Sequence, residues 1–157
     1  MISENLREEL QTRIASAVTP REAAVETMKR LQAEYGWLSD EAVEEAAELL
    51  GLSPLQVEEL ATFYEMLYRR PVGQRVIHCC DSISCWVMGG ESLMRHVAGL
   101  LEISVGETTS DGVFTLLPCC CLGNCGQAPT MMIGETLYGG LTLERAAKIL
   151  QQERERC

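Results

Sequence analysis

The chain has 157 residues, 46% of them hydrophobic, which is enough apolar material for one ordinary domain or two small ones. Its net charge of -10 opposes binding to a phosphate backbone, so we expect no nucleic-acid partner. No apolar run reaches the roughly 20 residues that a spanning helix requires, and the polar start lacks the order of a signal peptide. We therefore expect a cytoplasmic protein without direct membrane insertion.

Residues 1–72 are predicted to form an N-terminal helical bundle. Apolar residues recur at helical spacing over residues 6–67, which indicates three or four amphipathic helices. Capping boxes at 19–22 and 53–56 mark two helix starts, because in each a hydroxyl and a carboxylate or amide can satisfy free backbone N–H groups. Gly36 is placed to end a helix in the left-handed conformation.

The fourth predicted helix should turn Leu60, Phe63 and Leu67 toward the core of this bundle. The acid-rich stretch 41–48 is interpreted as a solvated helix face, with recognition of a protein partner as the alternative. No pattern in the bundle carries obvious chemistry, so we interpret it as an attachment module.

Residues 73–157 are predicted to form a second domain of the α/β (α+β) class. Short β-type runs alternate there with helical stretches, which suits helices packed on a small sheet. The expected strands are 75–79, 113–117 and 130–133, and the expected helices are 92–101 and 143–151.

Eight cysteines in a chain without an export signal favour metal or redox chemistry over disulfides. Seven of them fall into two tight groups, at 79–85 and 119–125. Each group follows a predicted strand. In a parallel or mixed sheet, two loops at strand ends can meet at one edge and gather four thiolates. The candidate ligands are Cys80, Cys85, Cys121 and Cys125.

Position selects these four from the crowded groups. Neighbours on a strand point to opposite faces, so Cys79 and Cys80 cannot both easily reach one metal, and Cys80 is nearer the loop. Cys121 is the last cysteine before the glycine-bearing turn. We interpret the remaining cysteines as small buried hydrophobes and, at the terminus, a frayed thiol: Cys79, Cys119, Cys120 and Cys157.

Spacing alone leaves three interpretations of the cysteine site open. Soft thiolates suit an iron-sulfur cluster, and two cysteine pairs with short loops also build a structural zinc site. Redox-active thiols are a third possibility, although the sequence contains no Cys-x-x-Cys.

The surroundings of the cysteines add further expectations. Gly123 and Gly126 lie where a backbone approaching a cluster needs positive φ or no side chain. Hydroxyls such as that of Ser82 could donate to sulfur and raise the reduction potential, whereas the charge of Asp81 would lower it. We expect core or surface roles rather than metal ligation for His78 and His96. The residues after Cys85 should shield the site from water: Trp86, Val87 and Met88.

Several longer motifs are distributed along nearly the whole chain. They are Gly36-Trp37-Leu38, Ala61-Thr62-Phe63-Tyr64, Cys80-Asp81-Ser82 with Cys85, Asp111-Gly112, Phe114-Thr115-Leu116-Leu117-Pro118, and Cys120-Cys121-Leu122-Gly123-Asn124-Cys125 with Ala128-Pro129. Through these motifs the sequence resembles the E-subunit family of bacterial NADH-quinone oxidoreductase, or complex I.

This resemblance implies an N-terminal helical bundle joined to a thioredoxin-like [2Fe-2S] ferredoxin domain. It implies one [2Fe-2S] cluster on Cys80, Cys85, Cys121 and Cys125, as part of a proton-translocating NADH:quinone oxidoreductase with no independent active site in this chain. The implied partners are the flavin subunit, which binds FMN and NADH, and the neighbouring iron-sulfur subunit. The implied location is the peripheral arm on the cytoplasmic face of the bacterial inner membrane.

Three alternatives to a complex I subunit stay open at this point. The equivalent subunits of NAD-reducing hydrogenase and of NAD-linked formate dehydrogenase would share the cluster and the flavin partner. A zinc-stabilised interaction module belongs to a different functional class. A free-standing ferredoxin is disfavoured, because such a carrier needs no helical half.

Overall fold

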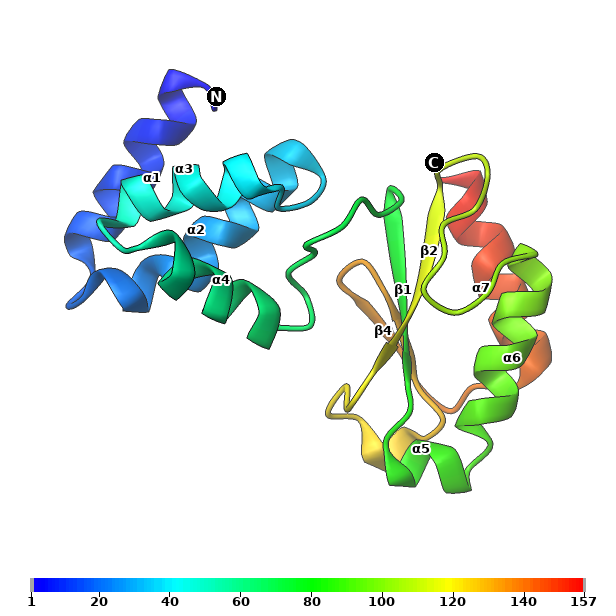
Figure 1. Ribbon diagram of the computed structural model, residues 1–157. Helices are drawn as coiled ribbons and strands as arrows, with labels where there is room; N and C mark the ends of the chain where they lie inside the picture. Colours follow the sequence, from blue (N-terminus) through cyan, green and yellow to red (C-terminus); the bar gives the residue numbers. More distant parts are fainter. Residues whose placement is uncertain (1, 157) are drawn as a thin grey trace. The chain divides into compact units, whose positions relative to one another are not determined.

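The computed structural model describes residues 2–156, which form two compact units that divide between Pro71 and Val72. Each unit has its own hydrophobic core. The first unit is helical, and the second combines helices with a sheet (Figure 1). A helical part followed by a mixed part is the order that the sequence predicts.

The helical unit contains four helices, as its apolar periodicity indicates. They are α1 (Glu4–Ser16), α2 (Pro20–Tyr35), α3 (Asp40–Leu50) and α4 (Pro54–Phe63). A serine or threonine hydroxyl accepts a hydrogen bond from a free N–H group at the start of every one of them. Gly36 ends α2 at φ 82°, in the left-handed conformation expected of it.

The two predicted capping boxes differ in detail. At Ser53 the box is complete, because the serine hydroxyl accepts from Gln56 N and the Gln56 side chain accepts from Ser53 N. At Thr19 only half of it forms. The Glu22 carboxylate accepts from Val18 N at 2.9 Å rather than from Thr19 N, so it satisfies a donor one residue earlier.

The core of the helical unit is formed by one face of each helix, with Leu10, Met28 and Val57 fully buried. The prediction that Phe63 faces inward is wrong, because its side chain is 76% exposed. Helix α4 turns Val57 and Ala61 into the core, and Phe63 lies about 200° around the helix from Ala61. The Phe63 ring instead meets the Tyr64 ring edge-on at 5.2 Å.

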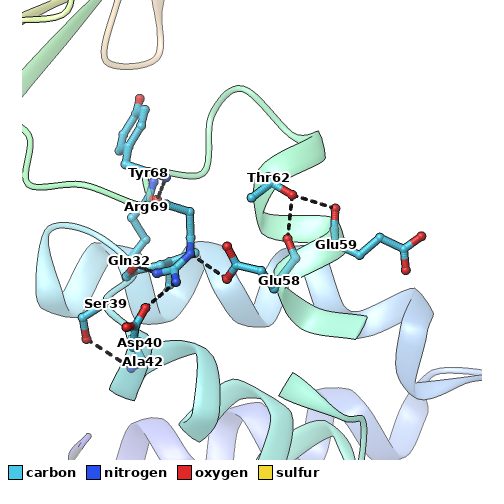
Figure 2. A network of polar contacts seen from close by, with 10 residues as sticks. Gln32, Ser39, Asp40, Ala42, Glu58, Glu59, Thr62, Tyr68 and Arg69 are labelled. Atoms are coloured by element: carbon cyan, nitrogen blue, oxygen red, sulfur yellow. Dashed lines mark hydrogen bonds and ion pairs between the residues drawn. The ribbon is translucent and has the colours of Figure 1, made fainter. Parts of the chain in front are cut away.

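A polar network fixes the segment that follows α4 onto the helical bundle (Figure 2). The Arg69 guanidinium donates to the carbonyl oxygen of Leu38, to Asp40 at 2.7 Å and to Glu58 at 2.8 Å. The Gln32 side chain accepts from Tyr68 N at 2.6 Å and donates to the carbonyl oxygen of Met66 at 2.9 Å. The side chains of Arg69 and Gln32 thus connect the segment after α4 with α2, α3 and α4.

The second unit is built on a four-stranded sheet in the order β2-β1-β3-β4. Strand β1 pairs parallel to β2 and antiparallel to β3, and β3 pairs antiparallel to β4. The strands are β1 (Arg75–Cys80), β2 (Phe114–Cys119), β3 (Met131–Ile133) and β4 (Thr136–Tyr138).

Helices connect and cover these strands. They are α5 (Ile83–Val87), α6 (Gly90–Leu101), the 3-10 turn η1 (Cys125–Gln127) and α7 (Leu143–Glu155). Helices α6 and α7 lie together on one face of the sheet (Figure 1). The helices and the sheet share a hydrophobic core in which Ile77, Phe114 and Met131 are buried. The predicted α/β class is confirmed, and no helix of residues 2–156 is long and apolar enough to span a membrane.

Candidate metal centre

The parallel pairing of β1 and β2 brings the two cysteine groups to one edge of the sheet. Cys80, the last residue of β1, lies opposite Cys119 at the end of β2. The next residue continues the contact, since Asp81 N donates to the carbonyl oxygen of Cys119 at 3.0 Å. Both chain segments therefore leave the sheet side by side.

The first pair, Cys80 and Cys85, is buried. Cys80 ends β1 and is 2% exposed, and Cys85 lies inside α5 and is 1% exposed. Burial raises the pKa of the Cys85 thiol, the interaction with Cys80 raises it further, and interactions with Thr130 lower it. Buried thiols of this kind become thiolates most readily when a metal binds them.

The second pair, Cys121 and Cys125, is exposed, and its sulfur atoms lie 3.9 Å apart. A tetrahedral metal with bonds of about 2.3 Å holds its sulfur ligands about 3.8 Å apart. Gly123 turns the chain between the two cysteines at φ 72°, and its N–H group donates to Cys121 Sγ at 3.4 Å. This loop therefore presents two sulfur atoms at the spacing that one metal ion requires.

Between residues 2 and 156, no three cysteine, histidine or carboxylate side chains gather closely enough to hold one metal ion. A structural zinc site needs four such ligands around one centre. A [2Fe-2S] cluster needs two thiolates on each of two irons, which the bridging sulfides hold apart. Two cysteine pairs at one edge supply the four thiolates that either kind of site uses.

The other cysteines occupy different surroundings. Cys79 and Cys119 are buried, as expected, and burial followed by the charge of Cys80 raises the pKa of Cys79 to about 12. Cys120 is exposed, so its interpretation as a buried hydrophobe is wrong. It follows the end of β2 and no longer lies under a helix. Cys157 lies outside the described residues.

The residues after Cys85, which are predicted to shield the site from water, are themselves largely exposed. Trp86 is 57% exposed, Val87 68% and Met88 61%. Ile83, which lies on the same helix as Trp86 and Val87, is 71% exposed. Helix α5 is only five residues long and turns Cys85 inward, so its other side chains point to solvent. These four residues form an exposed apolar surface beside the cysteines, which we call the α5 surface.

Charged side chains are absent from the sequence on both sides of the cysteines. Neither residues 82–90 nor residues 112–134 contain an aspartate, glutamate, lysine or arginine. This is unusual in a chain with 36 charged residues, made up of 13 basic and 23 acidic ones. Apart from Asp81, the cysteine edge is thus apolar and uncharged.

The other residues that the sequence analysis considered lie outside the two cysteine pairs. His78 is buried within β1 and His96 is half-buried within α6. Gly123 has the expected positive φ, whereas Gly126 lies within η1 and does not. Ser82 precedes α5 as its N-cap residue.

Sequence reasoning missed Thr130. This residue precedes β3, is 1% exposed, and contacts the chain segments of both cysteine pairs. Its only sequence signal is its place as the first residue of the predicted strand 130–133, just after the second cysteine loop, which gives no indication of side-chain contacts.

Comparison with known proteins places the chain in a family. A family model described as thioredoxin-like [2Fe-2S] ferredoxin matches residues 10–154. The E subunit of NADH-quinone oxidoreductase from Pseudomonas aeruginosa is 40% identical over 96% of this chain and 91% of its own length. The corresponding protein of Escherichia coli strain K12, which bears the same name, is 40% identical over 93% of this chain and 88% of its own length.

Solved structures agree on the fold. A crystal structure of NAD+-reducing [NiFe]-hydrogenase in the air-oxidized state superposes with a TM-score of 0.69 at 22% identity. The match covers 83% of this chain and 23% of the hydrogenase chain, and at this identity it supports the fold alone. The chain therefore belongs to the thioredoxin-like [2Fe-2S] ferredoxin family and, within it, to the E subunits of NADH-quinone oxidoreductase.

Proposed function

We propose that this chain is an electron-transfer subunit of NADH-quinone oxidoreductase and holds one [2Fe-2S] cluster on Cys80, Cys85, Cys121 and Cys125. The observation that carries this proposal is the presence of two cysteine pairs at one edge of the sheet, in a chain that a [2Fe-2S] ferredoxin family model matches over residues 10–154. Cys80 and Cys85 would hold one iron, and Cys121 and Cys125 the other.

When bound, the cluster takes up one electron and gives it up again, without bond changes in a substrate. The protein sets the potential at which this happens. Hydrogen bonds to the cysteine sulfurs, such as that from Gly123 N, stabilise the more negative reduced state and raise the potential. The exposed carboxylate of Asp81 acts in the opposite direction.

The partner in electron exchange is the adjacent subunit that binds FMN and NADH. This chain has no Gly-rich phosphate loop and no paired acid and base of its own. An electron carrier must bring its redox centre close to its partner, and here the exposed pair Cys121 and Cys125 lies beside uncharged sequence. We assign the α5 surface to contact with this flavin subunit, which would complete the shielding that the chain itself lacks.

The helical unit would serve as an attachment module toward the flavin subunit and the neighbouring iron-sulfur subunit. We propose residues 1–72 and 73–157 as the corresponding domains. The complex would place the chain in the peripheral arm, on the cytoplasmic face of the bacterial inner membrane.

The proposal is tested by reduction of the purified, cluster-loaded chain with two reductants. Dithionite should bleach the visible band of the cluster directly. NADH should bleach it only after the flavin subunit of the same complex has been added, because this chain has no NADH site. Bleaching by NADH without the flavin subunit, or its failure in the presence of that subunit, contradicts the proposed electron route.

A further inference from the structure

Two glycines outside the cysteine loops lie against the chain segments that carry the cysteines. They are Gly90, the first residue of α6, and Gly139, which follows β4. Both are buried, and neither has a positive φ, so backbone conformation does not require glycine at either position. The atoms around each residue are what exclude a side chain.

Gly90 faces the backbone of both cysteines of the first pair. A Cβ atom at this position would lie 2.8 Å from the carbonyl oxygen of Cys85 and 3.2 Å from that of Cys80. Cβ atoms in proteins essentially never come within 3.0 Å of such a neighbour, and a backbone atom cannot rotate away as the end of a side chain can. A methyl group at residue 90 would therefore displace the cysteine segment or the start of α6.

Gly139 lies against the turn that carries Cys125. A Cβ atom there would lie 2.5 Å from Asn124 Nδ2 and 2.7 Å from Gln127 Cβ, and these two residues lie on either side of Cys125. A hydrogen bond holds the same contact, because Gly140 N donates to the carbonyl oxygen of Gln127 at 2.5 Å. The chain after β4 is thus packed closely on the second cysteine segment.

The position of these segments determines the position of the sulfur atoms. A cysteine sulfur is joined to the backbone through one carbon atom, so a shift of the backbone moves the sulfur with it. Gly90 lies next to the pair that would hold one iron, and Gly139 next to the turn with a ligand of the other. Residues that orient metal ligands without touching the metal commonly change metal affinity by about tenfold to a hundredfold.

We infer that Gly90 and Gly139 are positioning residues of the metal centre, which fix the two cysteine segments because they lack a side chain. This inference rests on the proposed cluster. It places determinants of the site on α6 and after β4, outside both cysteine groups.

The test compares Gly90→Ala and Gly139→Ala in the full, cluster-loaded chain. The concentration of an iron chelator that removes half of the iron should fall about tenfold to a hundredfold in Gly90→Ala. A smaller fall is expected in Gly139→Ala, because the side chains of Asn124 and Gln127 can move in part. The electron paramagnetic resonance signal of the dithionite-reduced cluster should shift in both variants, because it depends on the arrangement of sulfur around the irons.

Gly99→Ala is the matched control. Gly99 lies in the same helix as Gly90 and also lacks a positive φ, and beyond the adjacent helix backbone no atom of residues 2–156 lies within 4 Å of its Cβ position. Its chelator resistance and its resonance signal should equal those of the original chain.

Leu93→Ala separates positioning from a general loss of stability. Leu93 is a core residue of α6 and is 1% exposed, so its truncation should destabilise the second unit. The resonance signal of the loaded Leu93→Ala chain should nevertheless match that of the original chain, because Leu93 is not in the way of either cysteine segment.

The outcomes distinguish this inference from the proposed function. An original chain without iron and sulfide would contradict the cluster itself. In a cluster-bearing chain, unchanged chelator resistance together with an unchanged signal in a glycine variant would overturn the role of that glycine. The same signal shift in Leu93→Ala would overturn the inference, since loss of stability alone would then explain it. If Gly90→Ala does not fold, Gly139→Ala decides the test, because its neighbours are side chains that can move.

Discussion

The two units treat their polar and charged groups in opposite ways. In the helical unit, charged side chains are numerous and find partners within the unit, as for Glu45, which accepts from Arg7 at 3.2 Å and from Tyr35 Oη at 2.6 Å. At the cysteine edge of the second unit, charges are absent over residues 82–90 and 112–134, and apolar side chains are exposed. A surface without charge and without cover suits contact with another protein.

The two units also differ in what their residues do, because those of the helical unit have structural roles and the cysteines of the second unit can bind a metal. Helix caps, a hydrophobic core and the Arg69 network stabilise the helical unit. These structural roles account for the residues that form them. The second unit places four thiols at one edge of its sheet, two of them buried and two exposed. The predictions below test whether the two units divide their roles in this way.

The largest effect should come from the ligands. Cys80→Ala should abolish the cluster, because one iron would lose half of its protein ligands. Cys79→Ala, one residue earlier on β1, should keep the cluster because Cys79 points into the core of the second unit. Iron content and the visible spectrum of the two purified variants measure this difference. Loss of iron in Cys79→Ala with retention in Cys80→Ala would reverse the ligand assignment.

A core substitution in the helical unit should lower stability and spare the cluster. Met28 is fully buried, and a change of buried methionine to alanine costs about 2–5 kcal/mol. Met88→Ala is the matched control, because Met88 is 61% exposed and its loss should cost within about 0.5 kcal/mol. Denaturation followed at the cluster band and by far-UV circular dichroism distinguishes the units. Simultaneous loss of both signals in Met28→Ala would show that they unfold as one.

A charge on the α5 surface should disrupt association with the flavin subunit. Val87→Asp should weaken binding by about tenfold to a hundredfold, because burial of an unpaired polar group costs about 1–3 kcal/mol. Val105→Asp places the same charge on a valine that is 43% exposed in the loop after α6, and it should bind normally. Titration of the flavin subunit with cluster-loaded chain measures both. Equal affinities would remove the α5 surface from the interface.

The smallest effect concerns the polar network of the helical unit. Arg69→Ala should lower the free energy of unfolding by about 1–2 kcal/mol, mainly through Leu38 and Glu58. Asp40 contributes little because its side chain is 90% exposed. Arg70→Ala removes an exposed neighbour of the same type and should be nearly neutral. Similar losses in both variants would mean that the network does not stabilise the unit.

Local sequence rules predicted most of the architecture. Caps such as Ser53 with Gln56 depend on residues within one helical turn, so they can be identified without tertiary information. Helix α5 and strand β4 were missed because they have only five and three residues, too few to show a periodicity.

The apolar periodicity of the sequence did not predict which apolar side chains are exposed to solvent. Phe63 is apolar and lies in a predicted helix, which is why it was expected to be buried, although its side chain is largely exposed. The pattern of a helix tells which residues share a face, but not whether this chain or a partner covers that face. The three backbone contacts of Thr130 with both cysteine segments were equally impossible to predict, because only the fold creates them.

The most direct test of the central claim is analysis of iron, zinc and acid-labile sulfide in the purified chain, together with its visible spectrum before and after dithionite. Two irons and two sulfides per chain, with a band that dithionite bleaches, are the expected result for a cluster on two cysteine pairs. One zinc per chain, no sulfide and no colour would contradict it and would mean that the four thiols close around a single metal ion.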